Sequence, residues 1–288
     1  MAESDPVQRG VKKYESGDFA GALKDFNAAI AINSKDLEAL DNRAMLYFQL
    51  GAKEKAFADL DRAIKFNPRD EFSLSKRGEF KRLTGDLSGS LVDYQKAVNI
   101  DPKSDVALIG KARTEIELAS YKNAEVDLKR AKALSPTDFQ IQYLLISFSS
   151  KQLKDQKATQ LMYENMLKMH AKSADDHFWL GSAHFILNES KLAEQEFANS
   201  IKLDPHFYQA YFNRAVIKNE SGDKQGALVD LNTSIGLCKG DARAYFNRSI
   251  LRKELGDSAG ADADFQRALE LDPNIKKNNT RILNKFIV

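Results

Sequence analysis

The sequence predicts an all-α solenoid, in which antiparallel helix pairs stack into a right-handed superhelix that ends in a C-terminal capping helix. Three observations in the sequence predict it. Prolines recur at a regular interval, glycines recur at the same interval, and two columns of small residues keep that period along most of the chain. The interval is about 34 residues, and a fixed period of this length is typical of stacked supersecondary units.

Five of the six prolines share one register. Pro68, Pro102 and Pro136 are evenly spaced by one period, and the steps onward to Pro205 and Pro273 are each close to two periods. Proline cannot continue a helix interior and biases the preceding residue away from helical angles, so each of these prolines marks the end of a helix. The glycines that keep the period are Gly17, Gly51, Gly85, Gly222 and Gly256.

Small residues locate one break in the period. Two columns keep the regular step, except that the steps from Ala158 to Ala193 and from Asn165 to Ser200 are one residue longer. Small side chains are needed where helices cross closely, because a larger one would overpack the crossing at a cost of roughly 1–3 kcal/mol. The columns therefore predict one inserted residue between Asn165 and Ser200.

Within one period the pattern is helical. In residues 37–50, apolar or small residues at Leu40, Ala44 and Phe48 follow helical spacing, and a second amphipathic run covers residues 53–66. A glycine, Gly51, ends the first run, and a proline follows the second. Each period therefore predicts a helix, a glycine turn, a second helix and a proline turn.

This pattern resembles the tetratricopeptide-repeat family, whose signature runs W-x2-L-G-x2-Y, then A-x3-F, then P within one period. Residues 174–207 match it with Leu180, Gly181, Ala193, Phe197 and Pro205. We place eight repeats at residues 3–36, 37–70, 71–104, 105–138, 139–173, 174–207, 208–241 and 242–275. Residues 276–288 carry Ile282, Leu283 and Phe286 at helical spacing and are predicted to form the capping helix.

The fifth repeat departs from the pattern. Residues 139–173 lack the glycine and the proline, hold Asn165 where alanine is expected, and contain the inserted residue. This irregularity either bends the array or divides it into two lobes, or it is sequence drift that leaves the superhelix intact. The predicted organisation is four repeats over 3–138, the irregular repeat over 139–173, three repeats over 174–275 and the cap over 276–288.

In stacked helix pairs the first helices line a concave groove, and the family resemblance implies a protein or peptide ligand there. One column of this groove is aromatic, and its neighbour contains asparagines that, in several relatives, hold the backbone of an extended peptide. An amide suits that role because it offers both a donor and an acceptor. The predicted contact residues are Asn42, Phe178, Trp179, Phe212, Asn213, Val216, Arg243, Phe246, Asn247 and Ile250.

Alternatives remain open at this point. The aromatic column also fits packing between neighbouring helices. A self-associating structural subunit, a homo-oligomer, is the second functional interpretation, and an enzyme is a remote third. Binding of a chaperone's C-terminal tail is not expected, because Val7, Val11 and Phe72 occupy positions where the carboxylate-clamping relatives have lysine or asparagine.

Composition and motifs argue against other classes. The chain has 43 Lys+Arg and 41 Asp+Glu, a net charge of +2, and residues of both signs are interspersed along it. No nucleic-acid partner is therefore expected. No segment is apolar over a bilayer-spanning length, so no membrane insertion is expected, and a cytoplasmic location is favoured; a signal peptide removed from a precursor would leave no trace here. His170, His177 and His184 are separated by two helical turns each, roughly 10 Å along a helix, which is too far to share a metal ion. We expect no cofactor.

Overall fold

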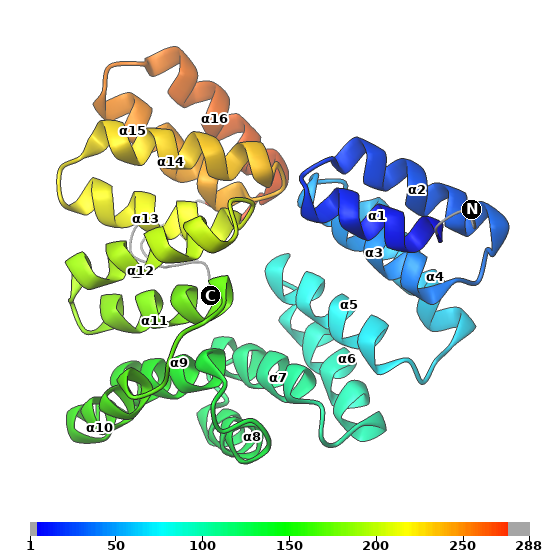
Figure 1. The fold of residues 1–288 in the computed structure, drawn as a ribbon, viewed down its shortest axis with the longest axis horizontal. Coiled ribbons are helices and arrows are strands. Elements are labelled where there is room, and N and C mark those ends of the chain that lie inside the picture. Colours follow the sequence, from blue (N-terminus) through cyan, green and yellow to red (C-terminus); the bar gives the residue numbers. More distant parts are fainter. Residues whose placement is uncertain (1–4, 276–288) are drawn as a thin grey trace. The chain divides into compact units, whose positions relative to one another are not determined.

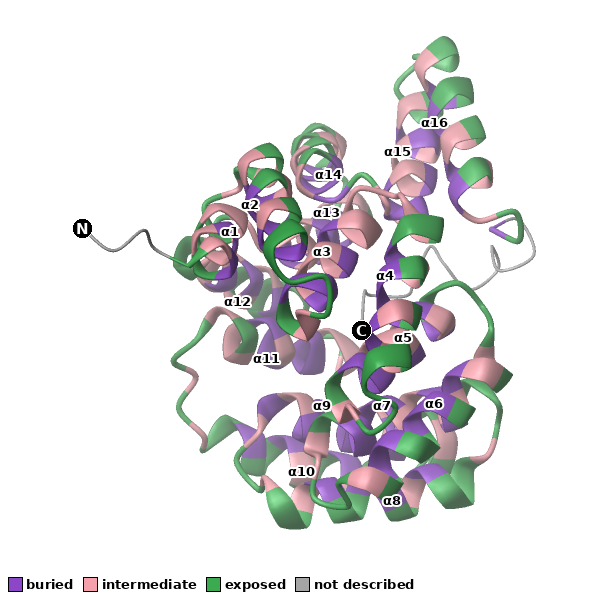
Figure 2. Cartoon of the chain, turned by 90° about the vertical axis from the view of Figure 1, so that its right-hand side faces the viewer, coloured by how far each residue is buried: buried purple, intermediate pink, exposed green. Residues whose placement is uncertain are grey.

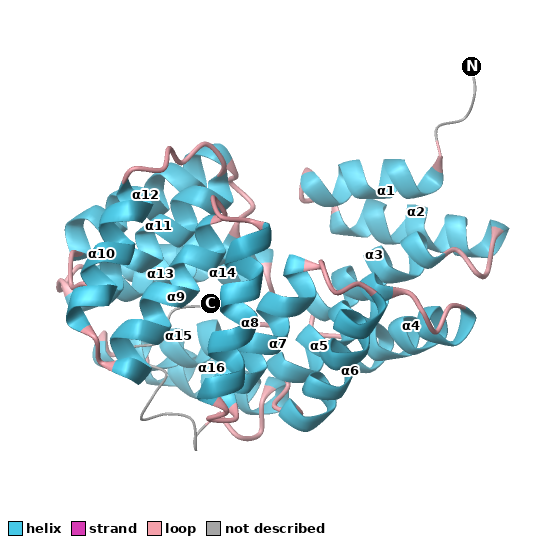
Figure 3. Ribbon diagram, turned by 90° about the horizontal axis from the view of Figure 1, so that it is seen from below, coloured by secondary structure: helices cyan, strands magenta, loops and turns pink. Residues whose placement is uncertain are grey.

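The computed structural model describes residues 5–275. These form two compact parts, residues 5–136 and 137–275, which we call the N-terminal and C-terminal blocks. Every regular element in the described residues is a helix, and none is a strand (Figure 3). The prediction of an all-α array of helix pairs is confirmed. The predicted capping helix, 276–288, lies outside the described residues.

The N-terminal block contains four helix pairs (Figure 1). In each pair a short turn joins the two helices, and the first helix of the next pair packs on the second helix of the one before. The helices are α1 Pro6–Glu15, α2 Phe19–Ile32, α3 Leu37–Gln49, α4 Lys53–Phe66, α5 Glu71–Leu83, α6 Leu87–Ile100, α7 Asp105–Glu117 and α8 Tyr121–Leu134.

The C-terminal block contains the remaining four pairs, the first of which is irregular. Its helices are α9 Phe139–Phe148, α10 Gln156–Leu167, α11 Ala174–Ile186, α12 Ser190–Leu203, α13 Tyr208–Glu220, α14 Lys224–Leu237, α15 Ala242–Glu254 and α16 Ser258–Leu271. Most helices in both blocks bury one face and expose another, whereas α9 is buried over nearly its whole length (Figure 2).

The fifth repeat contains the extra residue, but not where the small-residue columns placed it. Helix α9 starts one regular period after α7. Helix α10, in contrast, starts one residue more than a regular period after α8. The extra residue is therefore already accommodated before α10, in a π-helical turn over Ser149–Leu153. The prediction that it lies between Asn165 and Ser200 is wrong.

The burial of α10 follows this shifted register. Its buried residues are Thr159, Tyr163 and Met166. Each of them lies one residue more than a regular period after a buried residue of α8. Asn165 is exposed, so Met166 takes the position at which the sequence pattern expected alanine. Helix α10 consequently packs mainly on α9 and only lightly on α11, while α9 packs directly on α11.

The turn between the two helices of a repeat requires one residue with positive φ. Glycine supplies it at five turns, with φ between 79° and 91°, for example at Gly85. In the fourth, fifth and sixth repeats the same turn uses Ala119, Lys154 and Asn188, with φ of 59°, 55° and 62°. Non-glycine residues pay a steric cost of roughly 1 kcal/mol in this left-handed region, so the middle repeats carry turn strain that the others lack.

Replacing Ala119 by glycine is expected to leave stability unchanged or raise it by up to about 1 kcal/mol, because relief of this strain outweighs the added freedom of the unfolded chain. The matched control is Gly85→Ala, where an added Cβ meets nothing within 4 Å and only the φ of 87° opposes it. That variant should lose about 1 kcal/mol. Chemical denaturation followed by far-UV circular dichroism measures both; a stabilising Gly85→Ala would contradict the interpretation.

A repeated ion pair fastens most repeats internally. We call it the charged clasp: an arginine or lysine in the first helix bonds an aspartate in the second helix, at one constant sequence separation. The pairs are Arg9–Asp25, Arg43–Asp59, Arg77–Asp93, Lys111–Asp127, Arg214–Asp230 and Arg248–Asp264. Leu145 and Leu180 stand at the basic position in the fifth and sixth repeats, so the clasp is missing there.

Candidate functional site

Nine of the ten predicted contact residues lie on α11, α13 and α15, the first helices of the last three repeats, in the C-terminal block. Asn42 lies on α3 in the N-terminal block. The site is therefore built from the C-terminal block alone, and Asn42 lies outside it.

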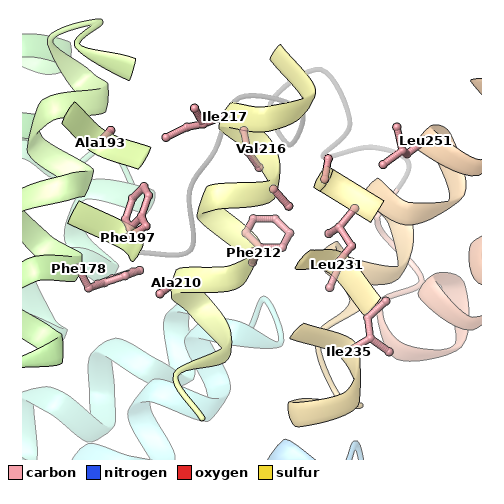
Figure 4. Packing of buried hydrophobic residues seen from close by; sticks show 13 residues of the cluster. Phe178, Ala193, Phe197, Ala210, Phe212, Val216, Ile217, Leu231, Ile235 and Leu251 are labelled. Carbon is pink, nitrogen blue, oxygen red and sulfur yellow. The ribbon is translucent and has the colours of Figure 1, made fainter. Parts of the chain in front are cut away.

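The aromatic column belongs to the core of the block. Phe178, Phe212 and Phe246 are 2%, 0% and 4% exposed, and Phe178 and Phe212 share one cluster with Phe197 and Leu231 (Figure 4). Asn213 is also fully buried. The side chains of Phe178, Phe212, Asn213 and Phe246 are therefore buried and present no surface to a ligand, as the packing interpretation of the aromatic column expects.

Trp179 lies next to this core but stays partly exposed. Its ring centroid is 5.3 Å from that of Tyr143 on α9 and 4.9 Å from that of Phe178. The indole is thus held by aromatic neighbours on two helices while part of it faces outward. Such a ring offers a ligand a large contact area at little cost in side-chain freedom.

Three predicted residues do come together. Val216 of α13 and Asn247 and Ile250 of α15 line one small hollow between these two helices. The other lining residues are Ala215, Asn219, Leu231 and Leu251. The hollow therefore has apolar walls and two amide side chains, those of Asn219 and Asn247.

Asn219 was not among the predicted contact residues. Its side-chain oxygen Oδ1 is buried and has no hydrogen-bond partner in the described chain. A buried acceptor without a donor costs roughly 1–3 kcal/mol, so the Oδ1 of Asn219 can accept a hydrogen bond from a donor that enters the hollow. The sequence pattern did not identify Asn219, because the predicted contacts on α13 came only from the repeat positions of Phe212, Asn213 and Val216.

The second amide is held in place by its own helix. Asn247 Nδ2 donates to the carbonyl oxygen of Arg243 at 3.0 Å, which leaves the Oδ1 of Asn247 as an acceptor. Arg243 in turn bonds Asp241, Nε to Oδ1 at 3.1 Å, and its guanidinium lies 6.0 Å from the centroid of Phe212. The Arg243 guanidinium thus makes one edge of the surface cationic, but it is already paired with the carboxylate of Asp241.

In the N-terminal block, Asn42 repeats the local geometry of Asn247. Its Nδ2 donates to the carbonyl oxygen of Glu38 at 2.9 Å. On the neighbouring first helix, Phe72 is 49% exposed and the Lys76 ammonium lies 5.0 Å from the centroid of its ring. This face offers an exposed aromatic ring and a cation, but these residues line neither the hollow between α13 and α15 nor the one between α12 and α13.

The histidines have local partners. His177 Nδ1 lies 2.5 Å from a carboxylate oxygen of Glu196, and His184 Nδ1 lies 2.7 Å from the hydroxyl of Tyr163 and 2.7 Å from a carboxylate oxygen of Glu189. Within residues 5–275, no three potential ligands gather in a metal-binding arrangement. Over the same part of the chain, no helix combines the length and the hydropathy that a bilayer crossing requires.

Comparison with known proteins agrees with this architecture. Family models described as tetratricopeptide repeat match residues 8–71 and 242–275. Among solved structures, yeast Tom70 is similar with a TM-score of 0.61 and 14% identity, covering 97% of this chain and 63% of that chain. A chain of the APC/C hetero-tetramer Cut9–Hcn1 is similar with a TM-score of 0.54 and 15% identity, covering 97% of this chain and 55% of that one. No curated protein sequence matches.

The fold and the repeat period thus define a helix-pair repeat protein. The chain contains tetratricopeptide repeats, as the sequence pattern indicated. At identities this low the two structures support the fold alone, and the chain spans less than two thirds of either one's length.

Proposed function

We propose that this protein is an interaction scaffold that binds a segment of another protein on the first helices of its last three repeats. The surface comprises Trp179 on α11, Val216 and Asn219 on α13, and Asn247 and Ile250 on α15. The observation that carries the proposal is the buried, unpartnered Oδ1 of Asn219 in a hollow that is also lined by Asn247 and by five aliphatic side chains.

The chemistry of the surface favours an extended peptide. Two amide oxygens accept hydrogen bonds, and backbone N–H groups are the donors that every peptide supplies regardless of its sequence. Ile250, which lines the hollow together with the buried Val216, would contact an aliphatic side chain, and Trp179 would cover a larger one. Family membership supports the proposal, since stacked helix-pair repeats use such extended surfaces for binding.

The experiment selects binding peptides from a random linear peptide library displayed on phage, using the full chain as bait. Trp179 is the only tryptophan in the chain, so its fluorescence reports directly on this surface. Selected peptides should change the emission of the wild-type protein on titration. The double variant Asn219→Ala/Asn247→Ala should bind them at least tenfold more weakly, since both amide acceptors of the hollow are lost.

Asn42→Ala is the matched control, because Asn42 makes the same bond to its own helix as Asn247 but lies in the other block. It should leave the affinity unchanged. Equal binding by the wild type and the double variant would refute the assignment, and a loss confined to Asn42→Ala would move the site to the N-terminal block. Far-UV circular dichroism checks that each variant is folded.

A further inference from the structure

The clasp arginines make a second contact that connects successive repeats. In the second, third and eighth repeats the outer nitrogen Nη1 donates to a residue at one equivalent position on the second helix of the preceding repeat. These bonds are Arg43 to Asn27 at 2.7 Å, Arg77 to Asp61 at 2.7 Å and Arg248 to Asn232 at 2.8 Å. In each case Nη1 meets a side-chain oxygen, an amide or a carboxylate.

The seventh repeat lacks this contact. Arg214 bonds the buried Asp230 through Nε at 2.8 Å and Nη2 at 2.7 Å, as the other clasp arginines do with their aspartates. The residue at the equivalent position on the preceding helix is Ala198, which has no side-chain oxygen to accept a bond. Arg214 Nη1 therefore has no hydrogen-bond partner among the described residues, although its guanidinium is otherwise fixed.

A hollow lies beside Ala198 and Arg214. It lies between α12 and α13, has a volume of about 330 Å³, and is lined by Lys191, Glu194, Gln195, Ala198, Arg214 and Lys218. These two helices are consecutive in the C-terminal block (Figure 1). Ala198, which has no side-chain oxygen, and the Arg214 guanidinium are both part of its lining.

The charges around the hollow favour an anion. Lys191, Arg214 and Lys218 contribute three cationic side chains, and Glu194 and the Asp230 behind them contribute two carboxylates. Asp230 is 1% exposed and engages both Arg214 and Lys218, which fixes these two cations in position. Lys191 is exposed at the rim. One positive charge remains in excess.

We propose that this hollow is an oxyanion-binding site, in which a carboxylate or phosphate oxygen from outside takes the position that Asn27, Asp61 and Asn232 occupy in the other repeats. Arg214 Nη1 donates to that oxygen, and Lys191 and Lys218 add charge attraction. Charge-assisted bonds of arginine to such groups are among the stronger polar contacts. This site is separate from the proposed peptide surface between α13 and α15.

The test follows the Nε–Hε signal of Arg214 in nitrogen-15 NMR spectra of the full chain at constant ionic strength. One titration uses inorganic phosphate, and the other uses the peptide acetyl-Gly-Asp-Gly-amide. A saturable shift with phosphate only indicates a phosphorylated compound as the source, and one with the peptide only indicates an acidic side chain of a partner. The absence of a saturable shift with either probe overturns the proposal.

Variants at Ala198 separate this site from general attraction to surface lysines. Ala198→Asn supplies the acceptor found at Asn27 and Asn232, so the apparent Kd should rise at least tenfold. Ala198→Ser is the matched control, since its hydroxyl is too short to bridge the helices, and its Kd should stay within twofold of wild type. Unchanged binding in Ala198→Asn would overturn the proposal.

The converse variant is Asn232→Ala. It removes the acceptor of Arg248. The Nε–Hε signal of Arg248 should then respond to whichever probe, phosphate or the peptide, shifts the signal of Arg214 in the wild type. An unresponsive Arg248 signal would show that the missing acceptor alone does not create such a site, and would contradict the comparison between repeats on which the proposal rests.

Discussion

The Asp93→Asn variant is expected to lower the free energy of unfolding of the N-terminal block by about 3 kcal/mol. Asp93 is 1% exposed and accepts bonds from Arg77 at 2.8 and 2.7 Å and forms an ion pair with Lys81 at 2.7 Å. Asparagine keeps the shape but removes the charge, so two partly buried cations lose their counterion. An uncompensated charge of this kind is among the most destabilising single changes.

The matched control uses the other carboxylate of the same arginine. Asp61 also lies 2.7 Å from Arg77, but its side chain is 61% exposed. Asp61→Asn should therefore cost less than about 1 kcal/mol. Urea unfolding followed by far-UV circular dichroism measures both losses. Tryptophan fluorescence does not suit this measurement, because Trp179 lies in the other block. Equal losses for the two variants would show that burial of the carboxylate does not decide the strength of its ion pair with Arg77.

Acid should remove this stabilisation in a defined direction. Burial raises the pKa of Asp93, but the hydrogen bonds from Arg77 and Lys81 outweigh it, so the net pKa lies below the ordinary value. A carboxylate with a lowered folded-state pKa contributes stability above its unfolded pKa and loses it as the pH falls through the folded pKa. The difference between wild type and Asp93→Asn should accordingly shrink in strong acid.

The second large effect concerns Asp41, whose pKa shift has the opposite sign. Asp41 is 4% exposed and accepts bonds from the Ser73 hydroxyl at 2.8 and 3.0 Å. Burial raises its pKa to about 7, against an ordinary value of 3.8. Because its folded pKa exceeds the unfolded one, this carboxyl destabilises the fold increasingly as the pH rises from about 4 to 7.

Asp41→Asn should therefore stabilise the N-terminal block, and its advantage over wild type should grow by about 2 kcal/mol between pH 5.5 and pH 8. Asparagine resembles the protonated acid and keeps an oxygen for Ser73. Urea midpoints of the two proteins across this pH range measure the effect, with Asp61→Asn as an exposed control whose difference from wild type should not vary. An advantage for Asp41→Asn that is independent of pH would contradict the raised pKa.

Repeat spacing alone predicted the helices, because prolines and glycines that stop a helix are local signals. The site was harder to predict. Successive residues on a helix point about 100° apart. Phe212 and Asn213 therefore face the core, while Val216 and Asn219 reach the hollow. Which of these neighbouring columns contacts a ligand depends on how adjacent helices pack, and the sequence pattern does not give that packing.

The misplaced insertion has a similar cause. Ala158 and Thr159 are adjacent small residues, and either one fits the close crossing to which the column pointed. The π-helical turn that decides between them has no sequence signal of its own here. The charged clasp, in contrast, has a sequence signal: in six of the eight repeats a basic residue stands at the same position and is followed by an aspartate at the same separation.

The charged clasp also bears on how such a chain can change by recombination. Because the same Arg–Asp pair and the same link to the preceding helix recur in the third and eighth repeats, a copy of one could be inserted or exchanged and still meet a compatible neighbour. The fifth and sixth repeats, which replace the arginine by Leu145 and Leu180, lack that shared connector. Duplication and loss of modules should therefore be tolerated in the clasped regions and resisted between them.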